Sequence, residues 1–139
     1  MKLHILLPVG LILSAAATLA ADLPPPVDFA TQIKPILADR CVECHNSQSL
    51  FGDLNLQTRE LAFRKRKAGP VLIPADPEKS MLYLVLKMPR KDSKSMPATG
   101  HKIPDKDLSL IRRWISEGAV WPKGKAGAVI RQIKTPQPK

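Results

Sequence analysis

The sequence predicts one small domain built mainly of helices that are joined by long loops. Residues 105–117 place apolar side chains on one helical stripe and end at a glycine, while residues 77–87 follow an aspartate and a proline that favour a helix start. One short segment, 52–56, alternates apolar and polar residues as an extended strand does. Removing a leader of about 20 residues leaves about 119, which suits a single domain.

Residues 1–21 have the features of a cleaved secretory signal peptide. Lys2 supplies a basic start, an apolar run extends from Ile5 to about Ala20, and small residues precede the expected cleavage point. The run is shorter than the ~20 residues that a membrane-spanning helix needs, and a proline and a glycine interrupt it. We therefore expect an exported protein, periplasmic in a bacterium, with an uncleaved N-terminal anchor as the weaker alternative.

The first helix is expected just after a proline-rich segment. Residues 22–27 contain three consecutive prolines and predict a stiff lead-in outside the core. Asp28 is a candidate N-cap for a helix over residues 29–33, and Pro35 either kinks that helix or begins a second one. Three apolar side chains at helical spacing would pack behind the motif that follows this helix: Ile33, Ile36 and Leu37.

The next segment, Cys41-Val42-Glu43-Cys44-His45, is the most informative motif of the chain. Two cysteines three residues apart, followed directly by a histidine, form the attachment signature of c-type haem. On a helix these three side chains leave the same face, so both sulfurs can form thioethers to one porphyrin while the imidazole binds its iron. The motif predicts one covalent haem c per chain, held by Cys41, Cys44 and His45, with His45 as the proximal ligand.

Other uses of the two cysteines are less consistent with the sequence. A haem-free thiol–disulfide couple normally follows a strand and precedes a helix, and no such setting is visible here. A structural disulfide remains a simple alternative. A zinc site needs four ligands, whereas the chain has two cysteines and three histidines, one of them His4 near the N-terminus.

The segment between the haem motif and residue 70 has weaker signals. The alternation at residues 52–56 predicts that Leu54 and Leu56 point into the core or toward the cofactor edge. Thr58 is a candidate cap for a brief helix. Four consecutive basic residues follow at 64–67, and we expect a solvated loop there in preference to a docking patch.

A mostly buried helix is predicted from residue 77 to about residue 87. Asp76 is its candidate N-cap, and Pro89 marks its expected end. Residues 88–104 are rich in lysine, serine, proline and glycine, so we expect a loop that crosses the far side of the haem.

The last helix should cover residues 105–117, with Gly118 as a left-handed C-cap. Residues 119–121 would then close the core. The domain is therefore expected to span residues 28–122, and residues 123–139 are expected to form a flexible basic tail because they contain little apolar material.

The sixth iron ligand decides what such a haem does, because methionine, histidine and an open position give different chemistry. Met81 lies on the apolar face of a predicted helix and is interpreted as core filler. Met88 and Met96 both precede a proline in the loop, where fixed backbone angles can aim a side chain. Met96 is preferred because the last helix follows it closely. His101 and an open site, which would suit a haem enzyme or a gas-binding protein, are the remaining alternatives.

The charge of the chain bears on its partners. The formal net charge is +10, which favours acidic patches on redox partner proteins and permits contact with an anionic membrane surface. A nucleic-acid role is disfavoured, because the chain is predicted to be exported and lacks a basic groove interleaved with aromatic residues. By chemistry alone, Trp114, Trp121 and nearby arginines are candidate partners of the haem propionates. Nothing in the sequence indicates a dimer, so we expect a monomer.

Several motifs occur in a characteristic order along residues 28–122. They are Asp28-Phe29, Ile33–Leu37, Cys41–His45, Gly52–Leu56, Pro74–Ser80, Met96-Pro97, Arg113–Ala119 and Trp121-Pro122. In this order they resemble the planctomycete-type cytochrome c domain, a branch of the small class I-like mono-haem cytochromes c.

The resemblance implies an all-α, cytochrome c-like haem-binding fold in which His45 is the proximal and Met96 the distal ligand. It implies an electron-transfer protein in place of an enzyme, although peroxidase-like activity is not excluded. The chain departs from the family where Ala75 replaces a common glycine, where the basic run from Arg64 replaces a glycine-rich stretch, and where a second Met-Pro pair occurs at Met88.

Overall fold

The described part of the chain, residues 24–131 of a computed structural model, is all-α as the sequence predicts. The predicted leader and residues 132–139 of the predicted tail lie outside the described residues. Within the described residues the only strand-like pairing is an isolated bridge between His45 and Leu50. The helical elements, in chain order, are a π-helix at Phe29–Ile33, α1 at Lys34–Arg40, a 3-10 turn at Phe51–Asp53, α2 at Arg59–Ala62, a 3-10 turn at Pro77–Lys79, α3 at Met81–Lys87, α4 at Asp105–Ser116 and α5 at Gly124–Gly127.

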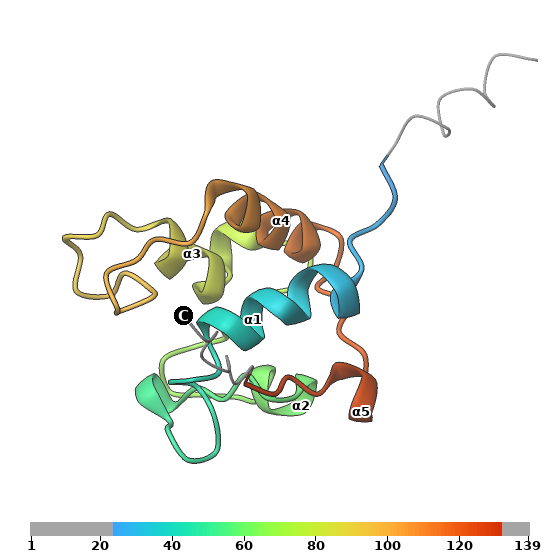
Figure 1. The fold of residues 1–139 in the computed structure, drawn as a ribbon, viewed down its shortest axis with the longest axis horizontal. Helices are drawn as coiled ribbons and strands as arrows, with labels where there is room; N and C mark the ends of the chain where they lie inside the picture. Colours follow the sequence, from blue (N-terminus) through green and yellow to red (C-terminus); the bar gives the residue numbers. More distant parts are fainter. Residues whose placement is uncertain (1–23, 132–139) are drawn as a thin grey trace, which may run out of the picture.

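Helix α1 runs through the middle of the molecule, with α3 and α4 on one side of it and α2 and α5 on the other (Figure 1). The expected N-cap is present, because the Asp28 carboxylate accepts hydrogen bonds from the backbone N–H and the hydroxyl of Thr31, at 2.8 and 2.6 Å. Pro35 lies in the first turn of α1, where its missing N–H leaves no bond unmade. It therefore begins a second helix that continues directly from the π-helical first one.

The helix predicted over residues 77–87 is broken at Ser80. Asp76 caps the 3-10 turn by accepting from the Lys79 N–H at 3.1 Å, as expected, but Ser80 is extended, with ψ at 115°. The fully buried Ser80 hydroxyl accepts from the Ile73 N–H at 2.8 Å and donates to the Asp76 carbonyl at 2.8 Å. A serine that binds nearby backbone in this way competes with helical bonding, which explains the interruption.

Helix α4 agrees with the prediction to within one residue, and Gly118 follows it with φ at 102°. Its buried face contains Ile111, Trp114 and Ile115. Trp114 belongs to an aromatic cluster at the end of the core away from the haem motif. There the ring centroids of Phe29 and Trp121 are 4.7 Å apart, and each lies 5.9 Å from that of Trp114.

Both expected chain extensions contribute to the core, which corrects the boundaries predicted from the sequence. Val27, assigned to the lead-in, is buried, and its N–H donates to the Glu117 carboxylate at 2.6 Å. Val129, assigned to the flexible tail, is also buried, and its N–H donates to the Gln57 carbonyl at 2.8 Å.

The expectation of a flexible tail is therefore wrong for residues 123–131. The Trp121 indole N–H donates to the Gly127 carbonyl at 2.8 Å, and a Cβ added at Gly127 would lie 1.7 Å from the Pro122 carbonyl oxygen. A glycine is required for this close approach. The sequence interpretation overlooked the short stretch Ala-Gly-Ala-Val-Ile at residues 126–130, in which Gly127 and Val129 are buried.

No helix within residues 24–131 is long and apolar enough to cross a membrane.

Candidate functional site

A cavity of about 550 Å³ opens beside the end of α1 that carries the cysteine–histidine motif. Its wall comes from that motif, the 51–56 segment, the basic loop after α2, helix α3 and residues 93–97. Leu54 and Leu56 line it, as the alternating pattern predicts. Most of the remaining wall is apolar: Phe51, Val71, Met81, Leu82, Val85 and Leu86.

His45 lines this cavity with one ring nitrogen already engaged. Its Nδ1 lies 2.9 Å from the Phe51 carbonyl oxygen, so Nδ1 carries the proton and donates to that oxygen. The other ring nitrogen, Nε2, is then left with the lone pair that a metal needs. Burial lowers the pKa of His45, the bond to Phe51 opposes this, and the positive charge of Arg66 lowers the pKa further. The imidazole is therefore neutral, which is its ligating form.

The two cysteines of the motif differ in their surroundings. Cys41 follows the last residue of α1, is buried and lines the cavity, while Cys44 is exposed and does not line it. Residues 41–44 form a turn in which the N–H groups of Cys44 and His45 donate to the Cys41 carbonyl at 3.2 and 3.1 Å. The structure thus brings Cys41 and His45 together at the cavity and leaves Cys44 on its outer side.

Burial raises the pKa of the Cys41 thiol to about 12. Its charged neighbours act on it less, Arg40 lowering the pKa and Asp39 raising it. Cys41 is therefore a protonated thiol at neutral pH.

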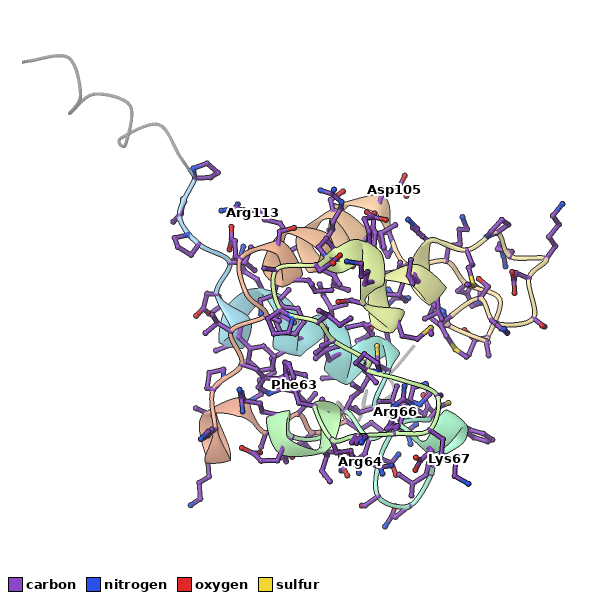
Figure 2. The ribbon with its side chains drawn as sticks, turned by 180° about the vertical axis from the view of Figure 1, so that it is seen from behind. Phe63, Arg64, Arg66, Lys67, Asp105 and Arg113 are labelled. Carbon is purple, nitrogen blue, oxygen red and sulfur yellow. The ribbon has the colours of Figure 1, made fainter. Side chains whose placement is uncertain are left out.

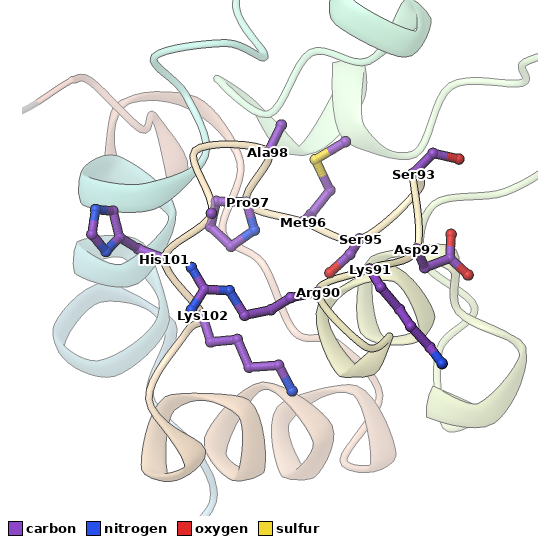
Figure 3. A pocket seen from close by; sticks show the side chains of 11 residues that line it. Arg90, Lys91, Asp92, Ser93, Ser95, Met96, Pro97, Ala98, His101 and Lys102 are labelled. Carbon is purple, nitrogen blue, oxygen red and sulfur yellow. The ribbon is translucent and has the colours of Figure 1, made fainter.

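Of the three residues considered as distal ligands, Met96 lines the cavity, whereas Met88 and His101 do not. Met81, which was interpreted as core filler, lines the cavity as well. The backbone N–H of Met96 donates to the Val85 carbonyl at 3.0 Å, which ties the loop to α3. Met81 has an exposed fraction of 37%, so its interpretation as core filler is wrong. Figure 3 shows the exposed His101 beyond Pro97, with its imidazole directed away from Met96.

Residues 41–100, which supply the cysteine–histidine motif, α3 and Met96, match the family model described as Planctomycete cytochrome C. This segment is similar to planctomycete-type cytochrome c domains. The match begins at Cys41 itself and ends in the loop before α4. No curated protein and no solved structure matches the chain.

The cavity fits the haem that a similarity to this family implies. A volume of about 550 Å³ is within the ~300–1,000 Å³ typical of cofactor sites, and the wall is apolar, as a porphyrin requires. The wall also includes the thiol of Cys41 and the imidazole of His45, whose proton is on Nδ1. Within residues 24–131, no group of three or more histidine, cysteine, aspartate or glutamate side chains could hold a bare metal ion, so a cluster-type zinc site has no support there.

The positive charges in the wall of this cavity come from Arg40, Arg66 and Lys94, and the two tryptophans do not line it. Arg40 and Arg66 are among the lining residues. The indole N–H groups of Trp114 and Trp121 donate instead to the carbonyls of Val120 and Gly127, at 2.9 and 2.8 Å. The two arginines and Lys94 are therefore the positively charged groups of the cavity wall that can face the two carboxylates of a haem.

Proposed function

We propose that this protein is an extracytoplasmic mono-haem c-type cytochrome that carries single electrons between redox partners. In this proposal Cys41 and Cys44 attach the haem, His45 is the proximal ligand and Met96 is the distal ligand. The observation that carries the proposal is the apolar cavity in which a neutral His45, held through Nδ1 by the Phe51 carbonyl, and the Met96 side chain are both wall residues.

The haem, when bound, supplies a one-electron couple. The protein's own groups then perform three tasks. The Phe51 carbonyl keeps the proton of His45 on Nδ1, which leaves Nε2 free to bind. The side chains of Leu54, Leu56 and Val85 exclude water, and a low dielectric around a haem disfavours the more highly charged oxidation state. Arg40 and Arg66 offer positive charge to the carboxylates.

A haem enzyme or gas-binding protein is the alternative function. It requires an open sixth position and polar groups beside it. Two thioether side chains on the cavity wall, Met81 and Met96, favour a closed position.

A haem-free thiol redox protein is less well supported. Catalytic thiols of this kind have a lowered pKa and an accessible sulfur. Cys41 is buried, and burial moves its pKa in the opposite direction, to about 12.

The proposed location and partners rest on the sequence. The leader-like pattern of residues 1–21 supports export, and the charge of +10 supports partners with acidic patches or an anionic membrane surface. If acidic partners are correct, the rate of electron transfer to them should fall as ionic strength rises, as stopped-flow kinetics would show. A rate that does not depend on salt would contradict this choice of partner.

The proposed function is tested by expressing the full chain in a host that matures c-type cytochromes. We expect the exported product to carry the added mass of one haem, to show a reduced c-type spectrum and to bind no carbon monoxide. Cys41→Ala and Cys44→Ala should each lose one of the two covalent links. A colourless product with two titratable thiols would support the thiol redox alternative, and rapid carbon monoxide binding would support the enzyme alternative.

A further inference from the structure

The turn that presents the Phe51 carbonyl to His45 is held by the basic run that follows α2. The Arg66 guanidinium donates to the Gly52 carbonyl at 2.8 Å and to the Gly69 carbonyl at 3.3 Å. Arg64 donates to the Asp53 carbonyl at 2.8 Å and also pairs with the Asp53 carboxylate. The carbonyls of Gly52 and Asp53, which follow that of Phe51, therefore both accept hydrogen bonds from arginines.

The run does not form the solvated loop expected from its sequence. Figure 2 shows Arg64, Arg66 and Lys67 on the loop after α2. Lys65 and Lys67 are exposed, whereas Arg66 is half-buried and lines the cavity. The Nε of Arg66 is buried without a hydrogen-bond partner, so this arginine is partly removed from water at the haem side of the loop.

Arg66 suits this position because its guanidinium is a planar fork. A fork can donate to two carbonyls on different segments at once, whereas a lysine ammonium is a point charge on a flexible stem. The Phe51–Asp53 turn, to which Arg66 donates, contains Gly52, whose φ of 67° lies in the left-handed region. A small change in the backbone at Gly52 would move the adjacent Phe51 carbonyl away from Nδ1 of His45.

We propose that Arg66 is a positioning residue that fixes the ring orientation of His45 by clamping the Phe51–Asp53 turn to the loop at Gly69. The proposal rests on the proposed function, since it concerns the proximal ligand of the haem. Arg66 acts through the turn and does not touch the iron. Its role is distinct from that of a charge that only pairs with a haem carboxylate, because it depends on the shape of the guanidinium.

The test compares two substitutions that both keep the net charge, Arg66→Lys and Lys65→Arg, in the mature holoprotein. Electron paramagnetic resonance of the oxidised protein reports the orientation and spread of the axial imidazole. We expect Arg66→Lys to shift and broaden the low-spin signal and Lys65→Arg to leave it unchanged. Gly52→Ala strains the same turn while keeping Arg66, so it should reproduce the Arg66→Lys spectrum.

The outcomes separate this inference from the proposed function. If the wild-type protein lacks covalent haem, the proposed function is wrong, and this result is obtained before any variant is compared. Normal haem content with an unchanged signal in Arg66→Lys overturns the clamp, and so does an equal shift in Lys65→Arg. A changed signal in Gly52→Ala together with an unchanged one in Arg66→Lys would show that the turn orients His45 without Arg66, which also overturns it.

Discussion

Nδ1 of His45 and the carbonyl oxygen of Phe51 lie 2.9 Å apart, across a short loop whose ends are joined by the bridge between His45 and Leu50. The Leu56 N–H also donates to the His45 carbonyl at 2.9 Å, so the histidine is fixed through both its ring and its backbone. The site is therefore built by the loop after the haem motif as much as by helix α1. This arrangement prepares a neutral imidazole before any metal binds.

Removing the sulfur of Met96 should change the haem spectrum. We expect Met96→Ala to lose the weak far-red absorbance of methionine-ligated ferric haem and to lower the reduction potential, because the thioether favours ferrous iron. Met88→Leu should change neither property, because Met88 does not line the cavity. Met81→Leu is the decisive comparison. Loss of the far-red band in Met81→Leu with its retention in Met96→Ala would transfer the distal role to Met81.

Ser80→Ala should destabilise the holoprotein by roughly 1–3 kcal/mol, because it leaves the partly buried Ile73 N–H without its acceptor and removes a hydroxyl that is fully buried. Guanidinium unfolding followed by circular dichroism would measure the loss. Ser116→Ala is the matched control, since that hydroxyl donates only to the Arg112 carbonyl on an exposed helix surface. The control should stay within about 0.5 kcal/mol of wild type. An equal effect in both variants would contradict the role assigned to Ser80.

Ala75→Gly should stabilise the protein by about 0.5–1 kcal/mol. Ala75 has φ at 66°, in the region where a Cβ is strained, and its N–H donates to the Ile115 carbonyl at 2.8 Å, which holds it there. The same substitution at Ala128, whose φ is −67°, should lower stability, because glycine there only adds freedom to the unfolded chain. Thermal melts of the two variants should move in opposite directions, and a lower melting temperature for Ala75→Gly would refute the argument.

The carboxylate of Glu117 should contribute to acid sensitivity. The hydrogen bond from the Val27 N–H, followed by those from Arg113, lowers the pKa of Glu117 below its ordinary value of 4.5. Its contribution is thus present above about pH 4.5 and is lost as the pH falls through the lowered value. Because the group is largely solvated, we expect at most about 1 kcal/mol.

Glu117→Gln should therefore flatten the stability profile between about pH 5 and pH 3, measured by urea unfolding at each pH. Glu60→Gln, at an exposed position on α2, is the control and should keep the wild-type slope. A profile for Glu117→Gln that runs parallel to wild type at low pH would show that the Val27 contact has no energetic effect.

The features that the sequence predicted correctly are those with local causes. Asp28, Thr58 and Asp76 each accept a hydrogen bond from an N–H three residues later, and Gly118 provides the left-handed end of α4. The apolar stripe of α4 correctly predicted its buried face, and the alternation at residues 54–56 correctly predicted that Leu54 and Leu56 face the cavity.

The features that were missed depend on contacts between segments far apart in the chain. A basic run normally indicates a solvated loop, but Arg64 and Arg66 bind carbonyls of residues 52 and 53, more than ten positions earlier. The Phe51 carbonyl could not be identified, because side-chain patterns carry no information about which backbone oxygen faces a histidine. Val129 was missed because the apolar stretch at residues 126–130 is too short, between basic residues, to show a periodicity.

The attachment of Met96 has a consequence for how such a haem would lose its distal ligand. The Met96 N–H binds the Val85 carbonyl, and the surrounding loop consists largely of exposed residues outside the aromatic cluster of the core. Segments of this kind open at a lower free energy than the global transition. Under the proposed ligation, mild heating would detach the sulfur in a separate early step, with helices α1 and α4 still protected from hydrogen exchange.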